Sequence, residues 1–440
     1  MVQTMGRTKI HERFYDAADR SIREEKGIKY METLCRFCNM TLKELFVDLG
    51  LSPLSNSFVH ENNLHKRNNF YPLHTYVCGH CFLVQLEEFE SPDEIFTDYV
   101  YFSSYSESWV QHARTYVEVI VERFGLDSNS QVLEIACNDG YLLQFMVEKQ
   151  IPSIGIEPAR NVAEEARKKG VTVLSEFFGS DLASSLVKKG TKADLLIGNN
   201  VLAHVPNIND FIIGMKQVLS ERGVITMEFP HLLRLIEQNQ FDTIYHEHFS
   251  YLSFLTVKFM IAEHGLTLFD VEELTTHGGS LRIYAKHEED ETKPITENVT
   301  RLELLEFQKG IHCIETYTTF ADRVKQIKRN ILQFVIDVKN QGKSIVGYGA
   351  PAKGNTLLNY CGIGKDMMDY VVDRNPAKQG LYLPGTHIPV FDIEHMYETK
   401  PDYVVIMPWN LKEEIFGQIS FIRDWGGQFV VWIPEVEVFH

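Results

Sequence analysis

The sequence lacks a surplus of basic residues. It has 43 lysines and arginines against 60 aspartates and glutamates, which gives a formal net charge of −17 at pH 7. Surfaces that bind nucleic acids are basic because they contact phosphates, so this balance argues against a nucleic-acid partner. A single anionic ligand remains compatible with it, because a pocket is set by its local charges.

Long apolar runs are also missing. No stretch approaches the ~18 residues that a membrane-spanning helix needs, and residues 1–30 lack the apolar segment of a signal peptide. We therefore expect a cytoplasmic protein with no membrane partner. Hydrophobic residues make up 44% of the 440 positions and aromatic residues 12%, which is enough for two or three packed domains.

The sequence has only seven cysteines, and four of them form two CxxC pairs. Cys35 and Cys38 make the first pair, and Cys78 and Cys81 make the second. In a reducing compartment such pairs do not persist as disulfides, whereas their spacing lets both thiolates of a pair reach one tetrahedral zinc ion. The alternative is four unrelated buried or redox cysteines. We predict a structural zinc site, with a complete ligand set that does not need His80.

Hydrophobic periodicity predicts an α/β protein with several parts. A helix is expected over 107–124, and strands over 132–135, 153–157, 193–197 and 223–227 alternate with helices, which indicates a parallel sheet covered on both faces. A similar alternation follows residue 342, with strands over 344–347, 369–372, 403–406 and 429–432. The predicted parts are an extension (1–30), a zinc-binding module (31–95), a first Rossmann-like domain (96–295), a helical connection (296–340) and a second Rossmann-like domain (341–440).

The motif LEIACNDG (133–140) runs a strand into a turn of small residues. Its one glycine, Gly140, does not make the GxGxxG loop of dinucleotide enzymes, although a missing Cβ there lets a ligand approach closely. Glu134 opens the motif, and Glu157 ends the next strand, where a carboxylate can accept both hydroxyls of a ribose. Unless these two are ordinary capping or surface acids, the pattern indicates a class I methyltransferase domain that binds S-adenosylmethionine.

Further cofactor contacts are predicted from position. Phe177 and Phe178 are candidate walls for the adenine, with core packing as the alternative, and Asn199 ends a strand where open α/β sheets bind ligands. The full predicted cofactor set is Glu134, Ala136, Asn138, Gly140, Glu157, Phe177, Phe178 and Asn199.

The segment Tyr245-His246-Glu247-His248 concentrates a phenol, two imidazoles and a carboxylate. Its histidines are two residues apart, so they do not form the HExxH zinc site, which needs a spacing of four on a helix. Histidine suits proton transfer near neutral pH. A turn in this segment would bring Glu247 onto His248, and a polar turn without catalytic function is the alternative.

Seven motifs occur together in an order that resembles the sugar C-methyltransferase family. They are the two CxxC pairs, YVYFSS (99–104), LEIACNDG, NNVLAHV (199–205), EFPHL (228–232) and YHEHFSYLS (245–253). The resemblance runs from about Met31 to the C-terminus. It implies that S-adenosylmethionine methylates a nucleotide-linked 4-keto-deoxysugar, typically at C-3, through an enolate that attacks the methyl group.

The resemblance also implies roles for individual residues. His248 matches the general base, Glu247 the carboxylate that orients it, and Tyr245 a phenol that contacts the substrate. His204 and Tyr101 match further active-site positions, with Tyr99 as an alternative to Tyr101.

The C-terminal domain contains the glycine-rich segment GYGAPAKGN (347–355). Gly354 falls at the wrong spacing for a dinucleotide loop, and Pro351 removes a backbone donor. The resemblance implies a Rossmann-like unit without a dinucleotide, and we predict that Lys353 and Asn355 hold the pyrophosphate of the substrate. Two alternatives remain: a nicotinamide-dependent oxidoreductase that uses this loop, and a zinc-ribbon scaffold or nucleic-acid-binding protein with an inactive methyltransferase fold.

Overall fold

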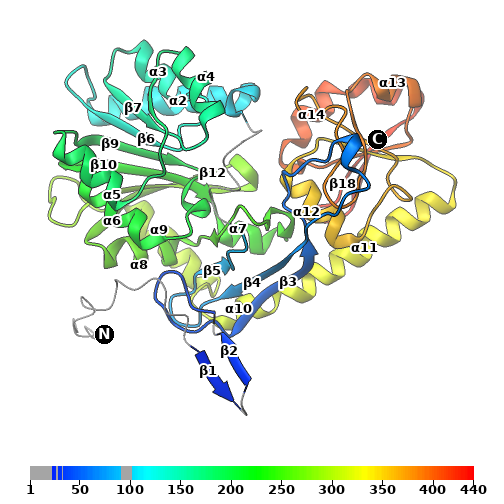
Figure 1. The fold of residues 1–440 in the computed structure, drawn as a ribbon, viewed down its shortest axis with the longest axis horizontal. Coiled ribbons are helices and arrows are strands. Elements are labelled where there is room, and N and C mark those ends of the chain that lie inside the picture. Colours follow the sequence, from blue (N-terminus) through cyan, green and yellow to red (C-terminus); the bar gives the residue numbers. More distant parts are fainter. Residues whose placement is uncertain (1–21, 26–27, 32, 91–101) are drawn as a thin grey trace.

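The computed structural model describes residues 22–25, 28–31, 33–90 and 102–440 (Figure 1). Tyr99 and Tyr101, the two candidates for the active-site tyrosine, lie outside these ranges. Within them the chain has a seven-stranded sheet and a six-stranded sheet, with a four-stranded sheet at their junction. A hairpin of β1 (Ile22–Glu25) and β2 (Ile28–Met31) precedes the sheets. No helix of the described ranges is long and apolar enough to cross a membrane.

The seven-stranded sheet contains five parallel strands in the order β10-β9-β6-β7-β8, of which all but β8 were predicted. Two further strands, β13 and β12, extend it beyond β10 in antiparallel orientation, so the expectation of a purely parallel sheet was incomplete. The strands are β6 (Val132–Ile135), β7 (Ser153–Ile156), β8 (Thr172–Leu174), β9 (Ala193–Asn199), β10 (Leu219–Pro230), β12 (Leu266–Leu274) and β13 (Ser280–His287).

Side chains alternate along each strand, so both faces of this sheet present apolar residues. Helices cover both faces. One face packs on α5, α6 and α8 through residues such as Leu133 and Ile225, and the other packs on α2, α3 and α4 through Val132 and Val224. The helices are α2 (Glu107–Phe124), α3 (Leu143–Glu148), α4 (Arg160–Lys168), α5 (Ser180–Lys188), α6 (Ile208–Val218) and α8 (Phe254–Glu263).

The four-stranded sheet draws on two distant parts of the chain. Its order is β11-β5-β4-β3, with antiparallel neighbours throughout. β3 (Glu44–Ser52), β4 (Tyr71–Val77) and β5 (Val84–Leu86) come from the cysteine-containing region, whereas β11 (Ser250–Tyr251) directly follows the YHEHF segment. The N-terminal module is thereby attached next to the predicted catalytic residues.

Helices fill the predicted connection between the large sheets: α9 (Glu297–Gln308), α10 (Ile314–Thr318) and α11 (Phe320–Asn340). The predicted apolar stripe of α11 is buried from Phe320 to Ile331. Phe320 stacks on Phe46 of β3, with ring centroids 4.6 Å apart. This stripe therefore packs against the four-stranded sheet, as well as against the C-terminal domain.

The C-terminal sheet has the order β16-β15-β14-β17-β18-β19 and is parallel except at β19. One hydrophobic core joins it to α11 and to β3, β4 and β5. Its elements are β14 (Ile345–Tyr348), α12 (Ala352–Cys361), β15 (Val371–Val372), β16 (Val390–Phe391), α13 (His395–Thr399), β17 (Tyr403–Ile406), α14 (Lys412–Gln418), β18 (Gln428–Val431) and β19 (Glu437–Phe439).

Candidate active site and metal site

The turn after β6 adopts backbone conformations that residues with a side chain rarely occupy. Ala136, Asn138 and Gly140 have φ values of 57°, 48° and 74°. The Ser103 N–H donates to Asn138 Oδ1 at 3.0 Å, and the Asn138 N–H donates to Glu157 Oε2 at 3.0 Å. Strained backbone of this kind persists only where its surroundings enforce it, and it concentrates at ligand sites. The geometry supports the predicted cofactor turn.

Gly140 is crowded by other parts of the protein. A Cβ at this position would lie 3.1 Å from Ala166 Cα and 3.2 Å from Val171 Cγ2. The missing side chain therefore makes room for α4 and the residues after it. That it also lets the cofactor approach closely stays a prediction.

Acidic side chains gather beneath this turn. Glu134 is 0% exposed, and neither of its oxygens has a hydrogen-bond partner among the described residues. Burial, together with the charges of Glu157 and Asp139, holds the Glu134 pKa well above its usual range. Lys169 Nζ lies 3.4 Å from Asp139 Oδ2.

Glu157 is better placed than Glu134 to meet a ligand, because it is 6% exposed. Its Oε1 accepts from the Ala159 N–H at 2.9 Å, and burial raises its pKa to about 7. A ligand that brings hydroxyl donors and a positive charge would stabilise these carboxylates. S-adenosylmethionine, which has ribose hydroxyls and an ammonium group, fits that requirement.

Of the remaining predicted cofactor residues, Asn199 and Phe177 are available to a ligand. Asn199 ends β9, and its buried Oδ1 has no partner in the described part of the chain. Phe177 is 45% exposed. Phe178 is partly buried and packs edge-on against Phe211, with centroids 5.4 Å apart; this contact favours the core alternative, and its role as an adenine wall stays a prediction.

The Tyr245–His248 segment forms a turn, closed by a hydrogen bond from the His248 N–H to the Tyr245 carbonyl (2.9 Å). The turn places the Tyr245 ring 4.0 Å from the His248 ring, and the His204 ring lies edge-on to His248 at 4.7 Å. His246 points the opposite way, with Nε2 3.1 Å from the Pro72 carbonyl. Three of the predicted catalytic side chains are therefore together.

Glu247 does not orient His248, contrary to the prediction. Glu247 Oε1 accepts from Asn56 Nδ2 at 2.6 Å, and no hydrogen bond joins Glu247 to His248 in the ranges that the structure describes. His248 Nδ1 instead lies 2.9 Å from the Thr243 carbonyl. Because a carbonyl only accepts, Nδ1 carries the proton, which leaves Nε2 as the basic nitrogen. A backbone carbonyl thus replaces the expected carboxylate.

Burial sets the protonation state of the histidines around this turn. It lowers the His248 pKa well below its usual range, and the neighbouring His204, His277 and Lys353 lower it further. Burial also lowers the His204 pKa to about 4, against a hydrogen bond to the Glu247 backbone, and the His277 pKa to about 4. All three imidazoles are therefore uncharged at pH 7.

The C-terminal domain reaches this site through α12, at Lys353. The Lys353 Nζ donates to Asn410 Oδ1 at 2.7 Å and lies 4.7 Å above the Trp409 ring. Asn355, in contrast, is 1% exposed and donates through Nδ2 to the Ser55 carbonyl at 2.6 Å. Asn355 therefore ties α12 to the N-terminal module, and its prediction as a pyrophosphate ligand is corrected.

His277 is a site residue that the sequence interpretation missed. It lies in the short helix η5 (Thr276–Gly278), between β12 and β13, with a left-handed φ of 53°. Its Nε2 is 2.9 Å from Asn200 Nδ2, and the Trp109 ring meets it edge-on at 5.1 Å. The run THGG (276–279) between two apolar strands was the available signal for this turn.

A fully paired carboxylate holds η5 in place. Glu228 of β10 is 0% exposed, and its Oε1 accepts from Thr276 Oγ1 at 3.0 Å. Its Oε2 accepts from Arg282 at 2.9 Å and lies 3.0 Å from His112 Nε2. This network fixes His277 at the carboxyl edge of the sheet.

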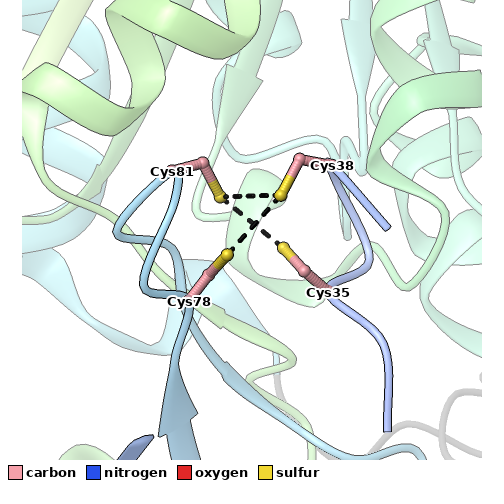
Figure 2. Close-up of side chains that lie close together, drawn as sticks. All are labelled: Cys35, Cys38, Cys78 and Cys81. Atoms are coloured by element: carbon pink, nitrogen blue, oxygen red, sulfur yellow. Dashed lines mark hydrogen bonds between the residues drawn. The ribbon is translucent and has the colours of Figure 1, made fainter. Parts of the chain in front are cut away.

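The four predicted metal ligands meet at one point (Figure 2). The Sγ atoms of Cys35, Cys38, Cys78 and Cys81 all lie within 4.8 Å of one another. Three of the separations are 3.5–3.6 Å, near the ~3.8 Å expected for four sulfurs about 2.3 Å from a tetrahedral zinc ion. None of the seven cysteines is in a disulfide, so the sulfurs fit a structural zinc.

The glycine-rich turn of the C-terminal domain is filled by the protein itself. Asp373 follows β15, where dinucleotide enzymes use a carboxylate to hold a ribose, but its Oδ2 accepts from the Ala350 N–H at 2.7 Å. The Lys378 Nζ donates to the Ala350 carbonyl at 2.9 Å, and a Cβ on Gly349 would lie 2.8 Å from Pro408 Cδ. This packing argues against a nicotinamide oxidoreductase.

Three family models match successive parts of the chain. Residues 35–96 match a candidate zinc-binding domain, residues 109–271 a methyltransferase domain, and residues 275–434 a C-methyltransferase C-terminal domain. The C-methyltransferase NovU of Streptomyces niveus is 34% identical over 406 residues, which cover 92% of this chain and 96% of that protein. The chain therefore belongs to the sugar C-methyltransferase family that its motifs resemble, and it is an S-adenosylmethionine-dependent C-methyltransferase.

Two weaker similarities are confined to part of the chain. The ubiquinone biosynthesis O-methyltransferase of Bartonella quintana (strain Toulouse) is 29% identical over 98 residues, 22% of this chain and 40% of that protein. The crystal structure of the PH0226 protein from Pyrococcus horikoshii OT3 aligns with a TM-score of 0.35 and 14% identity, over 45% of this chain and 99% of that one.

Proposed function

We propose that this C-methyltransferase acts on a nucleotide-linked 4-keto-deoxysugar, at C-3, with His248 as the general base. The observation that carries the proposal is the hydrogen bond from His248 Nδ1 to the Thr243 carbonyl (2.9 Å). It fixes the tautomer whose Nε2 is free to take a proton, beside the phenol of Tyr245. The family membership supports a sugar substrate.

The first step is removal of the proton from the carbon beside the ketone. The proton moves to His248 Nε2, and the electron pair of the C–H bond moves onto the ketone as an enolate. The Thr243 carbonyl keeps accepting from Nδ1–H, so it stabilises the imidazolium that forms. Bound S-adenosylmethionine supplies an electrophilic methyl group for the resulting carbon nucleophile.

Two further contacts belong to this proposal. Lys353 is the cation that approaches the catalytic histidines from the C-terminal domain, and electrostatics couple it to both His248 and His277. It suits the anionic pyrophosphate of a nucleotide substrate. Glu157 and Asn199 are the side chains best placed to hold the ribose and the adenine of the cofactor.

Hydrogen exchange tests the proposal. A panel of nucleotide-linked 4-ketosugars is incubated in D₂O with the enzyme and a cofactor analogue that has no transferable methyl group. We expect the wild type to exchange the hydrogen beside the ketone. His248→Gln should lose ~10²–10⁴-fold in rate, the usual share of a positioned base. His246→Gln is the matched control, because His246 faces Pro72 and not the site. Exchange at the wild-type rate in His248→Gln would assign the base to another residue.

A further inference from the structure

The orientation of His248 depends on one short helix, η4 (Phe241–Thr243). Its last residue provides the carbonyl that lies 2.9 Å from His248 Nδ1. The Thr243 Oγ1 donates back to the Gln240 carbonyl at 2.7 Å, so the turn is compact. A shift of this turn would therefore change the direction of the basic nitrogen, Nε2.

The C-terminal domain contacts both neighbours of Thr243. On one side, Trp409 Nε1 donates to Asp242 Oδ2 at 2.7 Å. On the other side, Thr356 Oγ1 of α12 donates to the Ile244 carbonyl at 3.0 Å. These two hydrogen bonds bracket the carbonyl that holds the base, and both come from residues more than 100 positions away in the sequence.

Trp409 also packs on the other wall of the site. A Cβ on Gly278 would lie 2.5 Å from Trp409 Cη2, so the glycine lets the indole reach η5. The Gln240 Nε2 donates to the Gly278 carbonyl at 2.7 Å. The indole therefore contacts both η4 and η5. The helix η4 provides the carbonyl that orients His248, and η5 contains His277.

The indole N–H also affects the charge on Asp242, which is 1% exposed. Burial raises the Asp242 pKa to about 6, while the charge of Lys353 and the Trp409 hydrogen bond oppose that rise. Lys353 is the charged group that acts on Asp242. The titratable groups that act on His248 are His204, His277 and Lys353. Without the indole donor, Asp242 would protonate at a higher pH.

We propose that Trp409 is a positioning residue of the methyltransferase site, which acts through Asp242 and the Thr243 carbonyl on His248. The C-terminal Rossmann-like domain then contributes to catalysis indirectly, because it holds the Asp242–Ile244 turn of the methyltransferase domain in place. The inference rests on the proposed role of His248 as the base, and it adds a residue that does not touch the substrate.

The test compares Trp409→Phe with Trp425→Phe. Trp425 is a matched control, because its Nε1 donates to the Pro401 carbonyl at 3.1 Å, within the same domain but on an unrelated segment. In the D₂O exchange assay we expect Trp409→Phe to lower kcat by ~10–100-fold, the effect of a misplaced catalytic group, with little change in KM or in affinity for the cofactor analogue. Trp425→Phe should stay within about twofold of the wild type.

Thr356, which holds the other neighbour of Thr243, provides a second test. Thr356→Val should lower kcat in the same direction as Trp409→Phe, and Thr356→Ser should keep it near the wild-type value, since serine keeps the hydroxyl. An unchanged rate in Trp409→Phe would overturn the proposal.

An NMR measurement does not depend on the substrate. The His248 imidazole is identified in spectra of ¹⁵N-histidine-labelled protein by its absence in His248→Gln. We expect the Nδ1–H tautomer in the wild type and a mixed or shifted tautomer in Trp409→Phe. If this change occurs while no ketosugar exchanges its hydrogen, the proposed substrate is wrong and the positioning role stands. If the His248 signal is identical in both proteins, the positioning role is wrong.

Discussion

Asn56 and Glu247 connect the N-terminal module to the catalytic segment. Glu247 is 4% exposed, and its carboxylate accepts a single described hydrogen bond, from Asn56 Nδ2 at 2.6 Å. A buried carboxylate with one neutral donor is stabilised less than it would be in water. Burial accordingly raises the Glu247 pKa to about 7. The residue therefore lowers the stability of the native state whenever it is ionised.

Glu247→Gln should reveal that effect on the free energy of unfolding. The folded pKa of about 7 exceeds the ~4.3 of an unfolded chain. The native state therefore binds more protons between these values, and wild-type stability falls as pH rises through 7. Glutamine keeps an acceptor for Asn56 without the charge. We expect the variant to be more stable than the wild type by about 1–3 kcal/mol at pH 8.5, with the difference shrinking toward pH 4.5.

Urea unfolding at both pH values measures this difference. Glu118→Gln is the control for the loss of one glutamate charge, because Glu118 is exposed. A Glu247→Gln protein that is less stable than the wild type at pH 8.5 would show that Asn56 and the surroundings stabilise the charge after all.

At the residue scale the sequence identified side chains better than it identified their partners. His248, His204 and Tyr245 meet as predicted because they belong to recognisable motifs. The group that orients His248 is a backbone carbonyl, which every residue has and no motif marks. The Asp242–Trp409 hydrogen bond spans 167 positions, and neither side chain has a pattern that points to the other.

At the scale of elements, the turn between β6 and α3 shows how a glycine can be required for two reasons. Gly140 has a φ of 74°, and its missing side chain also admits Ala166 and Val171. Gly170, in the loop after α4, shares only the first reason: its φ is 84°, but a Cβ there would meet nothing closer than 3.7 Å. Comparing substitutions at Gly140 and Gly170 therefore separates the effect of backbone strain from the effect of steric crowding.

Gly140→Ala and Gly170→Ala should differ in stability. Each should lose roughly 1 kcal/mol because alanine disfavours a left-handed φ. Gly140→Ala should lose about 1–3 kcal/mol more, since its methyl group crowds α4. Thermal unfolding measures the loss, and calorimetry on the folded variants should find nearly unchanged affinity for S-adenosylmethionine. Normal stability combined with weak cofactor binding in Gly140→Ala would support the original interpretation of a ligand contact.

Elements were predictable where local signals agreed. The helix α2 matches its predicted range because Ser106 accepts from the Trp109 N–H at its start and Gly125 ends it with a φ of 61°. The β12–β13 hairpin was missed. In β12 a bulge between Leu268 and Asp270 interrupts the alternation of apolar residues. In β13 the polar residues Arg282 and Lys286 are buried together with the apolar ones, because β13 lies between β10 and β12.

At the scale of the whole molecule, the cysteine cluster is part of the methyltransferase core. Cys35, Cys78 and Cys81 lie in the same hydrophobic cluster as Leu252 and Phe254, which follow the catalytic segment. The two residues between Cys35 and Cys38 also form hydrogen bonds with the segment after His204. The Arg36 guanidinium donates to the Pro206 carbonyl at 2.9 Å, and Asn209 Nδ2 donates to the Phe37 carbonyl at 2.9 Å.

Loss of the metal should therefore affect more than a peripheral module. We expect about one zinc ion per chain in the purified protein and a large drop in metal content in Cys81→Ser. Structural zinc can stabilise small domains by on the order of 10 kcal/mol, comparable with the whole stability of a typical protein. Cys81→Ser should lose cooperative unfolding and cofactor binding together, because its cluster shares the core of the methyltransferase domain.

Metal analysis, thermal unfolding and cofactor titration on the same preparations test this coupling. Cys313→Ser is the control, since Cys313 is a free thiol outside the cluster, and it should keep the metal, the unfolding midpoint and the cofactor affinity. Zinc-free protein that is folded and active would rule out the structural zinc. A Cys81→Ser protein that loses the metal but keeps its unfolding midpoint would show that the module folds independently of the catalytic core.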